Sequence, residues 1–316
     1  MKKILVIGAT GQIGTELVPE LRKKYGKENV VATGHKKKPD EEFKNSGPFE
    51  FLEATDKRAV EKMVEAHGID TIYHLASILS AAGEKNPQAA YFVNNTALYN
   101  VLEIAREKKL ERIMVPSSIA VFGPETPRNN TPNETVLKPT TMYGISKVHG
   151  ELLGNYYFHK FGVDMRGVRY PGIISNVAPP GGGTTDYAVD IFYYAVRGEP
   201  YTCFLKPDST LPMMYMPDAL KAIMQLADAD VKKLKHHTDF NLAAFSFSPA
   251  ELAAAIQEEL PGFKIEYKPD FRQAIADSWP RSIDDSCARE EWGWKPDYDL
   301  KGMVKDMIEK LSARLK

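Results

Sequence analysis

Residues 3–14 constrain the fold of this chain more than any other segment. An apolar run at residues 4–7 leads directly into a turn with a glycine at every third position, and a helical pattern follows. Such a strand, turn and helix start suits a pyrophosphate, because free N–H groups and the positive end of the helix dipole face the ligand. Glycines with this spacing occur in many loops, but their place at the start of an alternating chain favours dinucleotide binding over a structural turn. The predicted cofactor contacts in this segment are Gly8, Gly11, Gln12, Ile13 and Gly14.

Strand and helix patterns alternate through the first half of the chain, which favours a parallel sheet covered by helices on both faces. The predicted strands after the first are residues 29–33, 49–52, 69–75 and 112–116, and the predicted helices are 16–25, 57–66, 87–108 and 143–161. In the second half we predict helices at 187–197, 218–227, 249–260 and 300–315, a strand at 240–243 that returns to the main sheet, and a strand at 263–267. The expected fold class is α/β, with a doubly wound parallel (Rossmann) sheet and a smaller C-terminal substrate lobe. Residues 1–170 would form the dinucleotide-binding domain, rejoined by about 215–243, and residues 171–316 the substrate-binding lobe.

Charge and cysteine content restrict the class of partner. The formal net charge of −1 gives no general attraction to nucleic acid or to an anionic membrane, so we expect neither as a partner. Cys203 and Cys287 are far apart in sequence, which suggests buried, inert thiols and neither a disulfide framework nor a cysteine-based metal site, and we expect no metal. No apolar run is long enough to span a bilayer, and the first residues read as a core strand, so we expect a cytoplasmic protein.

The end of the second predicted strand bears on the choice of cofactor. Folds that prefer NAD usually place an acid here to bind the ribose 2′-hydroxyl, but this chain has Thr33, Gly34 and His35, followed by three lysines at 36–38. Either the backbone and Thr33 hold the ribose, or the basic cluster accommodates a 2′-phosphate, or the loop is simply solvated. The sequence leaves the choice between NAD and NADP open.

Other candidate residues follow the later strands, whose carboxyl ends face the ligand crevice in such a sheet. Asp56 would receive the adenine amino group or cap the helix that follows it. Leu75 and Ala76 are expected to line the cofactor, and Ser80 to contact the substrate amino or carboxylate group. Asn95 is a candidate polar contact to the cofactor. His74 lies in an apolar strand and is interpreted as a satisfied core histidine.

A serine pair and a Tyr-x-x-x-Lys motif carry the predicted chemistry. Ser117 and Ser118 follow a strand, and Tyr143 and Lys147 lie four residues apart at the start of a helix, where they share a face. A phenol is a poor base at neutral pH, but a neighbouring ammonium and a positive nicotinamide favour the phenolate. We therefore predict Tyr143 as the general base, assisted by Lys147, with Ser118 holding the reacting oxygen and Ser117 near the cofactor.

A loop rich in proline and glycine, residues 179–183, leads to Thr184, Thr185 and Asp186 at the start of a predicted helix. Hydroxyls and exposed amides at a helix N-terminus suit a substrate carboxylate, although these residues also suit a simple helix cap. Trp279 either closes the pocket over the substrate or only packs, and Arg169 pairs with a substrate carboxylate or with a structural partner.

Several motifs occur together along the chain: Gly8-x-x-Gly11-x-x-Gly14, His74-Leu-Ala76, the run at 117–123, Tyr143-x-x-x-Lys147, the run at 169–172 and the run at 291–296. With them the chain resembles the extended short-chain dehydrogenase/reductase family, which includes UDP-galactose 4-epimerase. The segments 179–189, 213–216 and 277–285 resemble the branch of that family formed by the short-chain L-threonine 3-dehydrogenases. The resemblance extends over essentially the whole chain.

The resemblance implies oxidation of the L-threonine β-hydroxyl to 2-amino-3-ketobutyrate with NAD. It implies that Lys147 also holds the nicotinamide ribose, that Tyr170 lies at the cofactor, and that a homodimer forms through residues 87–108 and 143–161. Relatives usually carry an Asp where Gly34 stands, so NADP use is a further expectation. The alternative functions are a nucleotide-sugar epimerase or dehydratase, and an inactive cofactor-sensing protein, against which the intact Ser118, Tyr143 and Lys147 argue.

Overall fold

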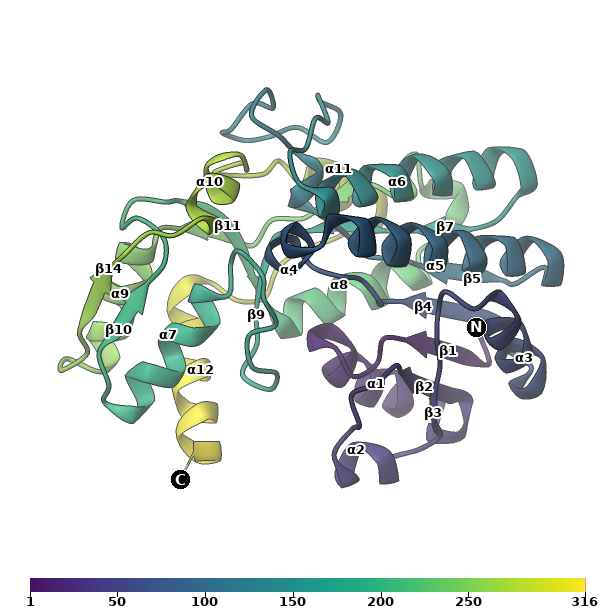
Figure 1. The fold of residues 1–316 in the computed structure, drawn as a ribbon, viewed down its shortest axis with the longest axis horizontal. Coiled ribbons are helices and arrows are strands. Elements are labelled where there is room, and N and C mark those ends of the chain that lie inside the picture. Colours follow the sequence, from purple (N-terminus) through teal and green to yellow (C-terminus); the bar gives the residue numbers. More distant parts are fainter. Residues whose placement is uncertain (316) are drawn as a thin grey trace.

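The computed structural model describes residues 1–315 and is built around a six-stranded parallel sheet (Figure 1). The strand order is β3-β2-β1-β4-β5-β7, and every pairing within it is parallel. Its strands are β1 (Ile4–Ile7), β2 (Val30–Gly34), β3 (Phe49–Phe51), β4 (Thr71–His74), β5 (Arg112–Met114) and β7 (Met165–Arg166). All four residues of β1 are buried and apolar, as expected for a central strand covered on both faces.

Helices cover both faces of this sheet. Ile4 and Val6 of β1 face one core, with α1 (Gln12–Tyr25) and α8 (Met216–Asp228), whereas Leu5 and Ile7 face the other. The second core holds α3 (Lys57–His67), α5 (Pro87–Lys108) and α6 (Met142–Phe161). This alternation follows from the two-residue period of a strand and confirms the doubly wound α/β prediction.

Two strands of the main sheet continue into a small second sheet at its carboxyl edge. After β5 the chain forms β6 (Ser117–Ser118), and after β7 it forms β8 (Val168–Tyr170). With β12 (Phe240–Asn241) these make a parallel sheet of order β12-β8-β6. The strand predicted at 240–243 therefore pairs with β8 in this extension, and with none of the six strands of the main sheet.

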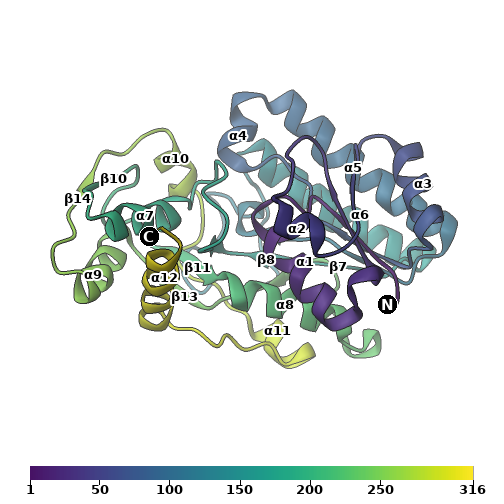
Figure 2. The same cartoon turned by 90° about the horizontal axis from the view of Figure 1, so that it is seen from below.

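A smaller body contains most of the second half of the chain (Figure 2). Its core is formed by side chains of helices that pack beside two short sheets, β10-β14 and β13-β11-β9. These elements are α7 (Tyr187–Arg197), α9 (Pro249–Glu259), α10 (Arg272–Asp277), α12 (Leu300–Leu315), β9 (Gly172–Ile174), β10 (Tyr201–Cys203), β11 (Leu211–Tyr215), β13 (Phe245–Phe247) and β14 (Ile265–Tyr267). β11 joins the two bodies, because Met213 packs in the core of the smaller one and Met214 in the core of the larger one.

Within residues 1–315, four short α-helices have no counterpart in the sequence prediction: α2 (Glu41–Asn45), α4 (Ser80–Lys85), α10 and α11 (Ser286–Trp292). Trp292 and Trp294, at and just beyond the end of α11, lie in the core shared by α1 and α8. The larger body is therefore completed by a segment outside the predicted return at 215–243. Within residues 1–315, none of the helices is both long enough and apolar enough to cross a membrane.

Candidate active site

The glycine-rich turn fits a dinucleotide pyrophosphate. Gly8 has φ +87°, and a Cβ there would lie 2.7 Å from the backbone nitrogen of Ala76. A Cβ at Gly14 would lie 2.6 Å from Ala9 Cα, whereas at Gly11 the nearest atom would be Gly8 O at 3.3 Å. Gly8 and Gly14 are therefore required by the packing of the protein itself, and Gly11 leaves room for a ligand.

The N-terminus of α1 presents donors to the same place. The helix begins at Gln12, and its N-cap, Gly11, provides no side-chain hydrogen bond to the first turn. The leading N–H groups of an α-helix have no partner within the helix, and with the helix dipole they favour an anion. The residues present therefore suit the phosphates of a dinucleotide cofactor.

A cavity of about 130 Å³ opens at the carboxyl edge of the sheet, between the larger and the smaller body. It is lined by residues that belong to separate sequence motifs. Those residues are Gln12, Ile13, Leu75, Ser80, Ser117, Ser118, Tyr143, Lys147, Tyr170, Thr184, Thr185 and Trp279. The remaining predicted cofactor residues, Gly8, Gly11, Gly14, Thr33, Gly34, His35, Asp56, Ala76 and Asn95, are not among its lining residues.

Tyr143, Lys147 and Ser118 form one group in this cavity. Tyr143 is the second residue of α6, and Lys147 Nζ lies 5.3 Å from the centre of its ring. Burial raises the pKa of Tyr143 to about 12, and a hydrogen bond with Ser118 opposes that rise. Burial lowers the pKa of Lys147 to about 8. Lys147 is fixed by donating to Pro116 O at 2.7 Å.

Gly144 determines how closely this group can assemble. A Cβ at this position would lie 2.2 Å from Ala120 O, in the 3-10 turn Ile119–Val121 that follows Ser118. Thr141 caps α6 by accepting from the Gly144 N–H at 3.1 Å. The start of α6 therefore lies directly against the segment that carries Ser118.

Two of the residues predicted near the adenosine make hydrogen bonds within the protein. The Thr33 hydroxyl donates to Val6 O at 3.0 Å, within the sheet. Asp56 accepts from the N–H groups of Arg58 and Ala59 and so caps α3, which is one of the two alternatives for this residue. His35 is exposed, and its Nε2 lies 2.9 Å from Glu53 Oε2.

Asn95 is the predicted cofactor contact, and its neighbour Asn94 binds the backbone of Ile78. Asn94 accepts from Ile78 N at 2.7 Å and donates to Ile78 O at 3.1 Å, which fixes the segment after β4. Asn95 is buried, and its Oδ1 has no partner. His74 is buried, as expected, but its Nδ1 is unpaired, so the expectation of a satisfied histidine is wrong. Burial, with the nearby charge of Lys147, lowers the His74 pKa to about 3 and keeps the ring neutral.

On the other side of the cavity, Thr184 is buried and its hydroxyl lies 3.1 Å from the Ser80 hydroxyl, which links α4 to the loop before α7. Asp186 accepts from the N–H groups of Gly182 and Gly183, both at 2.8 Å, so its carboxylate orders the loop and makes no cap bond to α7. Trp279 is buried at the cavity wall.

Arg169 has a structural partner. It forms a bidentate ion pair with Glu151, with N–O distances of 2.9 and 2.7 Å, and only 2% of Arg169 is exposed. Glu151 was not singled out from the sequence. Its signal is its spacing, since it follows Lys147 by four residues and so lies on the same helix face.

One cluster has the composition of a metal site. Ligand atoms of His236, Cys287 and Glu291 lie within 4.8 Å of one another. The Glu291 carboxylate is already bound by the His236 ring and by the N–H groups of Lys235 and His236.

Cys203 is buried, as expected, but Cys287 is half-buried, so the expectation of two buried thiols is wrong for the second.

Comparison with known proteins gives consistent matches over the full chain. The profile of the NAD dependent epimerase/dehydratase family matches residues 4–243. An uncharacterized epimerase/dehydratase of Staphylococcus saprophyticus is 51% identical over 317 residues, with 100% of this chain and 99% of the relative covered.

Two solved structures are also similar. The holo form of the GalE-like L-threonine dehydrogenase from Cupriavidus necator is 55% identical with a TM-score of 0.95, covering 99% of this chain and 100% of that one. A monomeric L-threonine 3-dehydrogenase from a metagenome, in its apo form, is 45% identical with a TM-score of 0.95, covering 99% of this chain and 100% of that one.

Proposed function

Because the chain belongs to the NAD dependent epimerase/dehydratase family, we propose that it is an L-threonine 3-dehydrogenase that uses a nicotinamide cofactor. The observation that carries the proposal is the convergence of Ser118, Tyr143 and Lys147 on one cavity with Thr184 and Thr185. The likeness to the Cupriavidus necator enzyme supports the choice of substrate.

The charge of the cavity lining argues against the alternative of a nucleotide-sugar epimerase or dehydratase. Among the described residues that line it, Lys147 is the single cation, and it belongs to the reacting group. A substrate diphosphate would call for further basic side chains.

In the proposed reaction Tyr143 takes the proton of the threonine β-hydroxyl, and Ser118 binds that oxygen and orients it. When bound, the oxidised nicotinamide cofactor supplies the acceptor for the hydride that leaves the β-carbon, and a positive charge. The Lys147 ammonium favours the phenolate of Tyr143 and holds the nicotinamide ribose.

We assign the cofactor to residues 1–170, with the return at 215–243, and the substrate to the lobe formed by residues 171–316. Gly8, Gly11, Gln12, Ile13 and Gly14 would hold the pyrophosphate, as the unfilled space at Gly11 suggests. Further cofactor contacts are proposed for Thr33, Gly34, His35, Asp56, Leu75, Ala76, Asn95, Ser117 and Tyr170, and substrate contacts for Ser80, Thr184, Thr185 and Trp279.

The direct test is to incubate the purified protein with L-threonine and either NAD or NADP, and to follow the absorbance of the reduced cofactor. We expect reduction of both cofactors, because no acid follows β2 and three lysines do. No reduction of either cofactor from neutral to alkaline pH, at high threonine, would contradict the proposed function.

Gly34→Asp is expected to lower kcat/KM with NADP about tenfold relative to NAD, since a carboxylate there repels a 2′-phosphate. The new Cβ would lie 3.0 Å from Thr10 Cγ2 and 3.2 Å from the backbone oxygen of Lys37. Gly34→Asn has the same shape without the charge and is the matched control. Equal NADP:NAD ratios in the two variants would contradict a role for charge at this position.

Leu152→Glu is expected to convert a homodimer into a monomer, as measured by light scattering after size-exclusion chromatography. Apolar side chains of α5 and α6 are exposed on one region of the larger body, with Leu152 64% and Phe92 57% exposed, and a carboxylate buried in such an interface is unfavourable. Phe271→Glu, at a residue 55% exposed before α10, is the control and should remain dimeric. A monomeric unsubstituted protein, like the metagenomic relative, would contradict the proposed dimer.

A further inference from the structure

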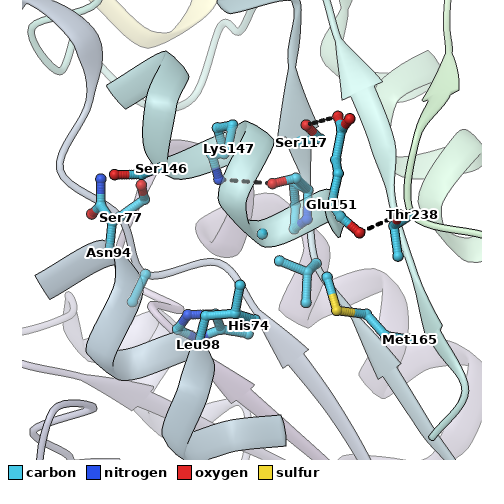
Figure 3. Close-up of a pocket in the computed structure, with 14 residues that line it drawn as sticks. His74, Ser77, Asn94, Leu98, Ser117, Ser146, Lys147, Glu151, Met165 and Thr238 are labelled. Atoms are coloured by element: carbon cyan, nitrogen blue, oxygen red, sulfur yellow. Dashed lines mark hydrogen bonds between the residues drawn. The ribbon is translucent and has the colours of Figure 1, made fainter. Parts of the chain in front are cut away.

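A second cavity lies beside Lys147, between α5, α6 and the segments that follow β4 and β5 (Figure 3). Its volume of about 20 Å³ is sufficient for one water molecule. Lys147, Ser117 and Glu151 line it together, and Thr238 lies beside Glu151. Lys147 therefore shares this cavity with the buried carboxylate of Glu151, which the proposed reaction does not use.

Glu151 is held rigidly in this position. Its carboxylate accepts from the Ser117 hydroxyl and from two nitrogens of Arg169. Its backbone oxygen accepts from the Thr238 hydroxyl at 3.0 Å. Ser117 lies opposite Arg169 where β6 pairs with β8, and both residues bind this carboxylate. Glu151 therefore links α6, which carries Tyr143 and Lys147, to β6, which carries Ser118.

Glu151 and Asp186 are the carboxylates that line the two cavities with Lys147, and Asp186 already accepts from the N–H groups of Gly182 and Gly183. Arg169 forms an ion pair with Glu151, and Asp239 lies 3.9 Å from Arg169. His74 is neutral, and Tyr143 faces the larger cavity. On the segment before β12, His237 stacks on Phe158, with 3.8 Å between ring centres.

We propose that Glu151 is a positioning residue of the active site, which keeps Lys147 in its charged form and fixes Ser117 and Ser118 relative to Tyr143. The inference rests on the proposed function, because it assigns Lys147 the task of favouring the Tyr143 phenolate. It adds a residue outside the Ser118, Tyr143 and Lys147 group, two helical turns from the phenol.

The charges of Glu151 and Arg169 determine the direction in which the Lys147 pKa changes. Burial lowers the pKa of Lys147, and Glu151 opposes that lowering, so the ammonium persists to higher pH than it would alone. Removing the negative charge leaves Arg169 with the more distant Asp239 as its carboxylate partner and lowers the Lys147 pKa further. The alkaline decline of kcat/KM, where Lys147 loses its proton, therefore moves to lower pH.

The experiment uses full-length protein labelled with ¹³C at the lysine ε-carbon, and Lys147→Arg identifies the Lys147 signal. In Glu151→Gln we expect the titration midpoint of that signal, and the alkaline limb of kcat/KM, to fall by about one pH unit. Glu151→Asp keeps the charge and should restore both values most of the way. Thr238→Val alters the same cavity without changing charge and should leave the midpoint in place.

An unchanged midpoint in folded Glu151→Gln, or an equal shift in Thr238→Val, would overturn the proposal. If Glu151→Gln does not fold because Arg169 is left unpaired, the double variant Glu151→Gln/Arg169→Gln removes both buried charges together. In that variant we expect a smaller fall of the midpoint, and no fall would overturn the proposal. A midpoint that shifts in a protein unable to oxidise threonine would contradict the proposed substrate while supporting the role of Glu151.

Discussion

Tyr143→Phe is expected to lower kcat for threonine oxidation by about 10³-fold and to leave the affinity for NAD nearly unchanged. The substitution removes one oxygen atom, which is the proposed proton acceptor, and retains the ring against which Lys147 Nζ lies at 5.3 Å. Steady-state kinetics and calorimetric titration with NAD measure the two quantities separately.

Tyr157→Phe is the matched control, because it removes a phenol oxygen from the same helix. The Tyr157 hydroxyl donates to Glu103 at 2.7 Å and is not among the residues lining the catalytic cavity. We expect this variant to keep its kcat while losing about 1 kcal/mol of unfolding free energy. A Tyr143→Phe variant that retained a tenth or more of the original kcat would exclude Tyr143 as the general base.

Gly14→Ala is expected to have the second largest effect, lowering the free energy of unfolding by about 1–3 kcal/mol and abolishing cofactor binding. The added methyl group would lie 2.6 Å from Ala9 Cα and from Gly8 O, both backbone atoms that are unable to move without displacing β1 or α1. Urea unfolding measures the loss of stability, and NAD titration measures the loss of binding.

Gly11→Ala separates these two effects. Its methyl group would meet a single backbone oxygen at 3.3 Å, so the fold should lose less than about 1 kcal/mol of stability. NAD binding should still weaken, since the methyl group would occupy space that the pyrophosphate needs. If Gly11→Ala bound NAD normally, the pyrophosphate would not lie at this turn.

Three helices could be predicted from the sequence to the residue. The ranges Pro87–Lys108, Tyr187–Arg197 and Leu300–Leu315 agree with the structure at both ends. The helix predicted from residue 16 begins at Gln12, because Gly14 in its first turn weakens the helical pattern there. The short α4 was missed because Gly83 weakens the helical signal in a six-residue element.

The candidate site could be predicted in composition but not in its supporting contacts. The sequence brought Ser118, Tyr143 and Lys147 together through their place after a strand and their helical spacing, and they share a cavity. It could not decide whether Arg169 would meet a substrate or Glu151, since that depends on which residues oppose each other between β8 and α6. Such pairing arises from tertiary contacts that local patterns do not encode.

The packing of Trp292 and Trp294 against α1 and α8 affects the protein during its synthesis. The side chains that complete the core beneath β1 are synthesised long after β1 and α1. Until Trp292 and Trp294 have been made, the nascent chain therefore holds its first strand and helix with part of their apolar surface uncovered. Domains usually fold as units from the N-terminus as they emerge, but here the core around β1 and α1 is complete only after Trp292 and Trp294 have also emerged.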